Sequence, residues 1–240
     1  MLQKLIAILL STFLLAACVH ADEASVKKAV EARLGDTKIK SVRKAPLGGL
    51  YEVVTENDLF YTDANVSFFF VGNLIDAKTL HNVTADRISD MRRVHFDKLP
   101  FDWAIKTVKG NGKRQLALFS DPDCPYCKGL EKELAKVTNV TVYTFLFPIA
   151  SLHPDANNKA KAVWCSKDRS KTWNDLMLNG TPPSGKADCD TPIEKIAQLG
   201  RTLHFTGTPT IVFADGHVVP GMIPADKLEK MLDAADKAGK

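Results

Sequence analysis

Apolar and polar positions alternate along the chain in short segments that are separated by turn signals. Residues 24–34 place apolar side chains at helical spacing, and Gly35 is typical of a helix stop. Four short strand-like runs follow, each bounded by turn-forming residues, at 39–42, 50–55, 59–62 and 66–71. This order predicts a small α+β unit with an antiparallel sheet.

The last of these runs, residues 66–71, is unusually apolar for a strand in so small a unit. Its sequence is Val-Ser-Phe-Phe-Phe-Val. Because an exposed apolar edge strand pairs readily with another chain, we expect this strand to be covered or paired. No cysteine and no cluster of catalytic residue types lies in this unit, which favours a role in assembly or docking.

A charged stretch follows and predicts a stiff helical linker. Residues 84–94 contain neither Gly nor Pro, and we expect the linker helix to span 84–100. A second pattern then begins near Phe101. It predicts strands over 103–108, 115–119 and 140–147, a helix over 128–134, a mostly helical region over 156–203, a hairpin at 210–213 and 218–219, and a closing helix over 225–238.

The first 21 residues predict a secretory signal. Lys4 precedes thirteen apolar or small residues, Leu5 to Ala17, whereas a membrane span needs about 20. Cleavage after Ala21 removes Cys18. Alternatively, Leu-Ala-Ala-Cys ending at Cys18 is similar to a bacterial lipobox, which would leave a lipid on Cys18, or the segment stays as an uncleaved anchor. Each interpretation places the remaining chain where disulfides persist.

Composition and charge narrow the functional classes. The chain has 240 residues, of which 45% are hydrophobic, so disorder is excluded as its main state. Lys plus Arg minus Asp plus Glu is 32 − 28 = +4. Without a basic block this charge argues against a nucleic-acid partner. A single long apolar run also excludes a polytopic membrane protein.

The candidate chemistry lies in the motif Cys124-Pro125-Tyr126-Cys127, between a predicted strand and a predicted helix. Backbone N–H groups and the helix dipole at such a position stabilise a thiolate, which is the nucleophilic form of cysteine. Cys127, in the first turn, can attack a mixed disulfide at Cys124 and release the partner. The order strand, C-x-x-C and helix is typical of a thioredoxin-like redox domain.

Other interpretations of the motif fit the residues less well. Zinc would need a second close ligand pair, whereas Cys165 and Cys189 stand apart. A c-type haem needs His directly after the motif, and Lys128 is there instead. We therefore expect no metal and no cofactor. Asp121 and Asp123 would disfavour a thiolate if they pointed inward, and we expect both to face solvent.

The four cysteines outside the signal allow three connectivities. If Cys124 pairs with Cys127, Cys165 is left with Cys189, and closing that loop stabilises the fold by roughly 3 kcal/mol. A regulatory disulfide is the alternative. On pattern alone, Thr208-Pro209 only starts a strand, because about 5% of bonds before proline are cis.

Together these residues resemble the DsbC/DsbG family of bacterial periplasmic thiol:disulfide isomerases. The resemblance covers the whole mature chain and includes Cys124-Pro125-Tyr126-Cys127, Thr208-Pro209, the Cys165/Cys189 pair and Val219-Pro220-Gly221. It implies an α+β fold. A cystatin-like dimerisation domain over 22–83 would come first, followed by the helical linker over 84–100. The thioredoxin-like catalytic domain would span 101–240 and carry a helical insertion.

The resemblance also implies the function. We expect a periplasmic homodimer that rearranges or reduces non-native disulfides in misfolded exported proteins, kept reduced by a DsbD-type membrane donor. Pro125 and Tyr126 would shape the motif, Thr208 would contact substrate, and Pro209 would be cis. Pro125 is similar to the DsbG dipeptide, whereas the second cysteine pair is similar to DsbC, which we favour. The alternatives are a thiol oxidase or a DsbG-like reductase and chaperone.

Overall fold

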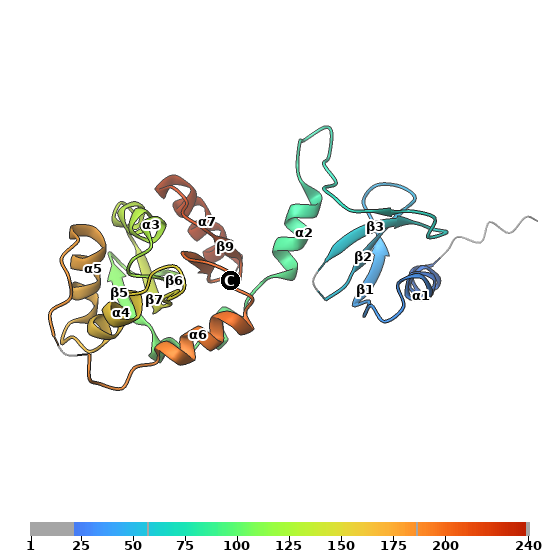
Figure 1. Ribbon diagram of the computed structural model, residues 1–240. Coiled ribbons are helices and arrows are strands. Elements are labelled where there is room, and N and C mark those ends of the chain that lie inside the picture. Colours follow the sequence, from blue (N-terminus) through green and yellow to red (C-terminus); the bar gives the residue numbers. More distant parts are fainter. Residues whose placement is uncertain (1–21, 57, 186, 239–240) are drawn as a thin grey trace, which may run out of the picture. The chain divides into compact units, whose positions relative to one another are not determined.

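The chain forms two compact units, one ending at Asp86 and the other starting at Arg87. The computed structural model describes residues 22–56, 58–185 and 187–238 (Figure 1). The signal predicted over 1–21, including Cys18, lies outside the described residues.

In the first unit, helix α1 (Glu23–Leu34) packs on an antiparallel sheet with the strand order β1-β2-β3-β4. Asp22 caps the helix, because its Oδ1 accepts a hydrogen bond of 2.7 Å from the Ser25 N–H. Val26 and Val30 on α1 are fully buried against the sheet. The strands are β1 (Ser41–Lys44), β2 (Leu50–Val54), β3 (Leu59–Asp63) and β4 (Phe69–Phe70).

The prediction of a strand over 66–71 is wrong for most of this range, because β4 spans only Phe69–Phe70. The Asp63 carboxylate accepts hydrogen bonds from the N–H groups of Ser67 (2.6 Å) and Phe68 (3.4 Å), and Val66 has a left-handed φ of 52°. These contacts hold the chain in a turn, so strand pairing starts later than the apolar pattern indicates.

The linker helix is shorter than predicted. Helix α2 spans Val83–Met91, and the rest of the predicted 84–100 helix is irregular except for a 3₁₀ turn at Phe96–Lys98. The Val94 N–H donates to the Gly216 carbonyl at 2.9 Å. Because this bond and the burial of Phe96 tie the segment to the second unit, it cannot continue as a free helix.

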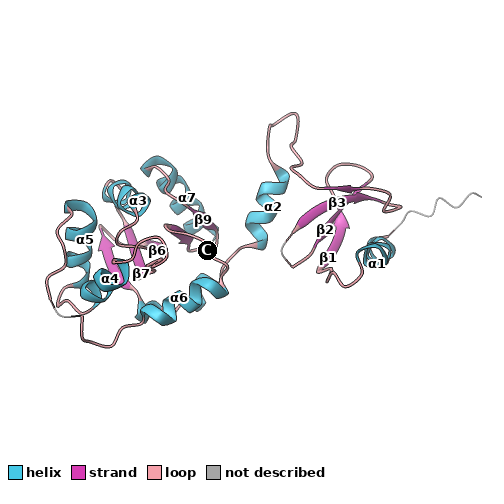
Figure 2. Ribbon diagram, in the orientation of Figure 1, coloured by secondary structure: helices cyan, strands magenta, loops and turns pink. Residues whose placement is uncertain are grey.

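The second unit is built on a mixed sheet with the strand order β5-β7-β6-β8-β9, in which only the β6–β7 pairing is parallel. Figure 2 shows its strands flanked by helices. The strands are β5 (Ile105–Lys109), β6 (Arg114–Ser120), β7 (Val140–Leu146), β8 (Thr210–Phe213) and β9 (Val218–Pro220). The helices are α3 (Pro125–Ala135), α4 (Ala156–Trp164), α5 (Arg169–Asn179), α6 (Ile193–Thr202) and α7 (Ala225–Ala238). The predicted α+β class with a thioredoxin-like domain is confirmed.

The central strand β6 is buried on both faces. Leu116 and Leu118 belong to a core shared with α3 and α7, whereas Ala117 and Phe119 point to the opposite core, which includes Ile196 of α6. This period of two is what a strand between two helical layers requires. The carboxyl end of β6 therefore meets the start of α3 in the middle of the unit.

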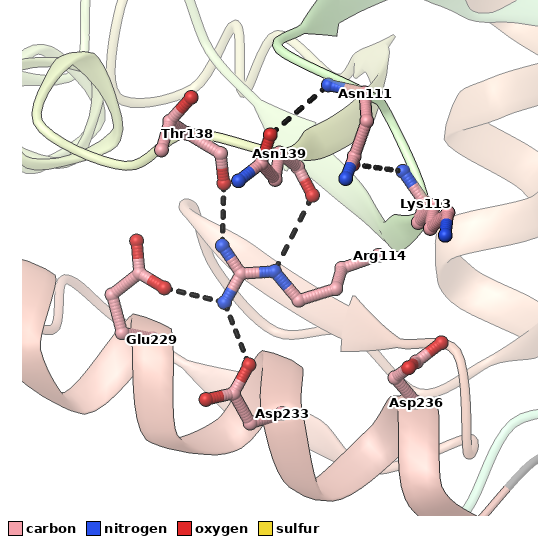
Figure 3. Close-up of a pocket in the computed structure, with 8 residues that line it drawn as sticks. All are labelled: Asn111, Lys113, Arg114, Thr138, Asn139, Glu229, Asp233 and Asp236. Carbon is pink, nitrogen blue, oxygen red and sulfur yellow. Dashed lines mark hydrogen bonds and ion pairs between the residues drawn. The ribbon is translucent and has the colours of Figure 1, made fainter.

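An arginine fastens the opposite end of β6. The Arg114 guanidinium lies between two acidic side chains of α7, Glu229 and Asp233, and the carbonyls of Thr138 and Asn139 (Figure 3). The hollow of about 380 Å³ beside it is lined by these groups. Since the guanidinium already donates to four oxygens, we interpret these contacts as structural. They hold the start of β6 against α7.

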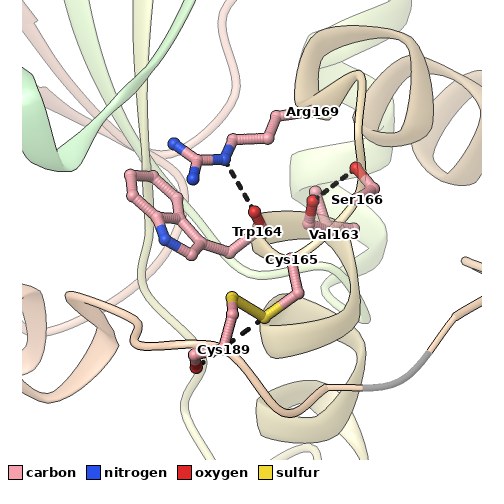
Figure 4. The surroundings of a disulfide bond; sticks show 6 residues. All are labelled: Val163, Trp164, Cys165, Ser166, Arg169 and Cys189. Atoms are coloured by element: carbon pink, nitrogen blue, oxygen red, sulfur yellow. Dashed lines mark hydrogen bonds between the residues drawn. A yellow bond between two sulfur atoms is a disulfide. The ribbon is translucent and has the colours of Figure 1, made fainter.

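The predicted helical region over 156–203 consists of α4, α5 and α6 with a loop between the last two. Cys165 at the end of α4 forms a disulfide with Cys189 in that loop. Arg169 covers this corner, with its guanidinium 3.8 Å from the centre of the Trp164 ring and its Nε donating to the Trp164 carbonyl (Figure 4). The disulfide thus attaches the loop to the end of α4, the first helix of this inserted region.

Candidate active site

Cys124 is the N-cap residue of α3. Its φ and ψ of −68° and 121° are extended, and Pro125 occupies the first helical turn. The Cys124 backbone N–H donates to the Asp121 carbonyl at 3.2 Å, which closes the turn that follows β6. The sulfur therefore lies at the positive end of the helix dipole, where a thiolate is stabilised.

Cys127 lies one turn further into α3 and is fully buried. Burial raises the pKa of its thiol to about 12, while the Ser120 hydroxyl and the Asp121 N–H act in the opposite direction. The Asp121 N–H donates to the Cys127 sulfur at 3.4 Å. The two cysteines of the motif are free thiols in this structure, and both are buried, with 5% of Cys124 and none of Cys127 accessible to solvent.

The loop before β8 faces Cys124. The Cys124 S–H donates to the Thr208 carbonyl at 3.4 Å, and the Thr208–Pro209 peptide bond is cis. Between the cysteines, Tyr126 is 67% exposed. The structure therefore brings the predicted motif residues and the Thr208–Pro209 segment together, whereas Cys165 and Cys189 are engaged with each other. The roles of the motif residues and of Thr208–Pro209 in exchange chemistry stay predictions.

The expectation that Asp121 faces solvent is wrong, because its side chain is fully buried. Its Oδ1 accepts from the Asp123 N–H at 2.8 Å. Its Oδ2 accepts from the Ile149 N–H at 2.7 Å and lies 3.0 Å from Nδ1 of His153. A buried carboxylate is tolerated only with such partners, so Asp121 fastens the loop after β7 to the loop that carries Cys124.

Asp123 is partly exposed, with 19% of its side chain accessible, and it is paired. Nζ of Lys159 on α4 lies 2.7 Å from its Oδ1 and 3.2 Å from Asp155. A cation from the insertion therefore offsets the negative charge beside the motif. The pair links α4 to the reactive loop.

Glu131 is a buried carboxyl on α3, four residues after Cys127. Its Oε1 accepts a hydrogen bond of 2.7 Å from Nε1 of Trp173. Burial raises the pKa of Glu131 to about 7, although this hydrogen bond and the charge of Lys109 act in the opposite direction. Glu131 also lines a cavity of about 230 Å³ between α3, α5 and the β5–β7 edge.

Apolar side chains are exposed near the motif. Tyr126 is joined by Met222, which is 46% exposed and packs on α3 so closely that a Cβ at Gly129 would lie 2.5 Å from its Sδ. Leu152 is 69% exposed and belongs to the loop that Asp121 holds. This surface is suited to apolar segments of a polypeptide.

Sequence reasoning missed three residues of this region, Ser120, His153 and Glu131, and placed the Asp121 carboxylate wrongly in solvent. Glu131 carried a usable signal, because it lies at helical spacing from Cys127 and between the buried Leu130 and Leu134. His153 carried none, since its partner lies 32 residues earlier in the chain.

Comparison with known protein families finds two matches. Residues 101–236 match the thioredoxin-like domain, and residues 17–85 match the disulfide bond isomerase protein N-terminal domain. Within the part of the chain that the structure describes, no helix combines the length and apolar character needed to cross a membrane.

Individual proteins are similar over most of the chain. The probable thiol:disulfide interchange protein DsbC of Bordetella parapertussis is 44% identical over 87% of this chain and 73% of its own length. The thiol:disulfide interchange protein DsbC of Dickeya dadantii is 31% identical over 98% and 96%. A crystal structure of a disulfide interchange protein from Neisseria gonorrhoeae is 48% identical, with a TM-score of 0.56, and the match covers 57% of this chain and 99% of that one.

The raised pKa of Glu131 predicts a pH-dependent loss of stability. Between the ordinary value of 4.5 and about 7 the folded protein binds more protons at this site than the unfolded chain. The free energy of unfolding therefore falls as pH rises through this window. In Glu131→Gln this loss should be absent. Relative to the parent, the variant should gain up to about 3 kcal/mol between pH 4 and pH 8, measured by urea unfolding.

Glu133 on the same helix is the matched control. Lys136 and the Ala225 N–H lower the pKa of Glu133, so Glu133→Gln should not produce a gain with rising pH. Unfolding free energies of Glu131→Gln and the parent that stay parallel from pH 4 to pH 8 would contradict the assignment.

Proposed function

Because the chain belongs to the DsbC family of thiol:disulfide interchange proteins, we propose that it is a periplasmic isomerase of non-native disulfides in exported proteins. The resemblance recognised in the sequence is confirmed, and the chain is a thiol:disulfide interchange enzyme. The single observation that supports the finer proposal is the unequal placement of the two motif sulfurs. Both sulfurs are buried, but Cys124 is the N-cap residue of α3, whereas Cys127 lies inside the helix, where burial raises the pKa of its thiol.

The proposed reaction begins at Cys124. Its thiolate attacks one sulfur of a substrate disulfide, so a Cys124–substrate disulfide forms and the other substrate sulfur leaves as a thiolate. If a substrate thiolate then attacks the bound substrate sulfur, a new substrate disulfide forms, Cys124 is released, and the reaction is an isomerisation. If the Cys127 thiolate attacks the Cys124 sulfur instead, a Cys124–Cys127 disulfide forms and the substrate is released in its reduced form.

Substrate would bind beside Thr208 and across the exposed apolar side chains. Because the Thr208 carbonyl already accepts from the Cys124 S–H, an extended substrate on this loop would place its sulfur next to Cys124. Tyr126, Leu152 and Met222 would contact apolar segments of misfolded proteins. The reductive branch consumes two electrons, and a DsbD-type membrane reductant is the proposed source.

We further propose that the first unit pairs with a second copy of the chain. β4 ends the sheet as described, and the consecutive residues Phe68 to Val71 are 69%, 40%, 50% and 86% exposed. An apolar sheet edge of this kind favours pairing with another chain. Residues 1–21 are the proposed signal, with a lipid on Cys18 as the alternative.

Replacing each motif cysteine separately tests the division of roles. Cys124→Ser should lose isomerisation of a scrambled multi-disulfide protein by at least about 100-fold, because the attacking thiolate is gone. Cys127→Ser should still attack and should accumulate the mixed disulfide, seen as a mass shift after acid quenching. Full activity in Cys124→Ser, or a mixed disulfide located on residue 127 in the parent, would contradict the proposal.

Sedimentation tests the pairing of the first unit. The mature protein should sediment as a dimer at micromolar concentration, and Val71→Asp should shift it to the monomer, because a carboxylate at a paired edge is desolvated. Leu152→Asp is the matched control, with similar exposure in the second unit, and should stay dimeric. A monomeric parent chain, or a dimeric Val71→Asp, would exclude this interface.

A further inference from the structure

The Ser120 hydroxyl is buried beside the motif and has no hydrogen-bond partner among the residues that the structure describes. Ser120 ends β6, where its carbonyl accepts from the Phe147 N–H at 2.8 Å. Its backbone is therefore fixed by the sheet, and its side chain is fully shielded from solvent. A buried hydroxyl without a partner has a free-energy cost, so its position calls for an explanation.

The Cys127 sulfur is the neighbour that explains it. The Ser120 hydroxyl is among the groups that lower the pKa of Cys127, and the adjacent Asp121 N–H donates to the same sulfur at 3.4 Å. A neutral thiol is a weak acceptor, whereas a thiolate is a strong one. A hydroxyl held beside the thiol thus finds its full partner only when Cys127 ionises.

We propose that Ser120 is a catalytic residue of the resolving step, in which its hydroxyl donates a hydrogen bond to the Cys127 thiolate. This inference rests on the proposed function. In that step the Cys127 thiolate attacks the Cys124 sulfur of the mixed disulfide. A Cys124–Cys127 bond forms, the bond to substrate breaks, and the substrate sulfur leaves as a thiolate that takes a proton. The enzyme dithiol is oxidised and the substrate disulfide is reduced.

The Ser120 hydroxyl would influence whether each mixed disulfide ends in isomerisation or in reduction. Because burial disfavours the Cys127 thiolate, the resolving step depends on the donors around that sulfur. The first attack by Cys124 does not use the Cys127 thiolate. Ser120 therefore affects how long the mixed disulfide lasts, and with it the division between isomerisation and reduction, without affecting its formation.

Single-turnover kinetics of the reduced full-length protein with a scrambled multi-disulfide substrate test this assignment. Acid quenching gives the rates at which the mixed disulfide forms and is resolved. Ser120→Ala should lengthen its lifetime about tenfold, the effect of one hydrogen bond to a charged sulfur, and should raise the ratio of isomerised to reduced product. Its formation rate should stay within about twofold of the parent, as for a residue outside that step.

Two further substitutions separate the hydroxyl from the packing. Ser120→Thr and Ser120→Val have similar volumes and differ in the hydroxyl, so Thr should resolve the mixed disulfide about tenfold faster than Val. This comparison also serves if Ser120→Ala fails to fold. Thr141→Val removes a buried hydroxyl that donates to the Gly112 carbonyl and should leave the partition unchanged.

Equal lifetimes in the Thr and Val variants, or an equal change in Thr141→Val, would overturn the role of Ser120 while leaving the isomerase proposal intact. A parent protein that forms no mixed disulfide at Cys124 would overturn both. A slower first attack in Ser120→Ala, with an unchanged resolving rate, would also overturn the assignment.

Discussion

The cost of placing a negative sulfur away from water shapes this site. Cys127 is fully buried and its thiol ionises only with difficulty, whereas Cys124 occupies the N-cap position of the same helix. One turn of α3 thus holds one sulfur at the helix N-terminus and a second sulfur whose thiol pKa is raised by burial. In the proposed isomerisation this inequality lets a substrate rearrange its own disulfides, because a fast second thiol would end each encounter in reduction.

The surrounding fold maintains the inequality. β6 is fixed at its start by Arg114 and delivers Ser120 and Asp121 at its end, with cores on both faces. Asp121 contributes its N–H to the Cys127 sulfur, its carbonyl to the Cys124 N–H, and its carboxylate to the loop after β7. A displacement of this residue would therefore disturb the contacts of both cysteines together.

The residues of the motif and the order of the elements could be predicted from the sequence because their signals are local. Strand, C-x-x-C and helix follow one another directly, and period-two alternation marks the sheet. Asp121 could not be placed in this way, because its partners Ile149 and His153 come from a distant loop. The short β4 likewise depends on the Asp63 side chain capturing two backbone N–H groups, which overrides the β preference of the Phe run.

Site-resolved alkylation of the reduced protein measures the inequality of the two sulfurs most directly. The protein is exposed to a limiting amount of iodoacetamide at pH 7, and peptide mass spectrometry gives the labelling rate of each cysteine. The account predicts that Cys124 is labelled at least about 100-fold faster than Cys127, because a buried thiol with a raised pKa offers little thiolate. Equal rates, or faster labelling of Cys127, would contradict it.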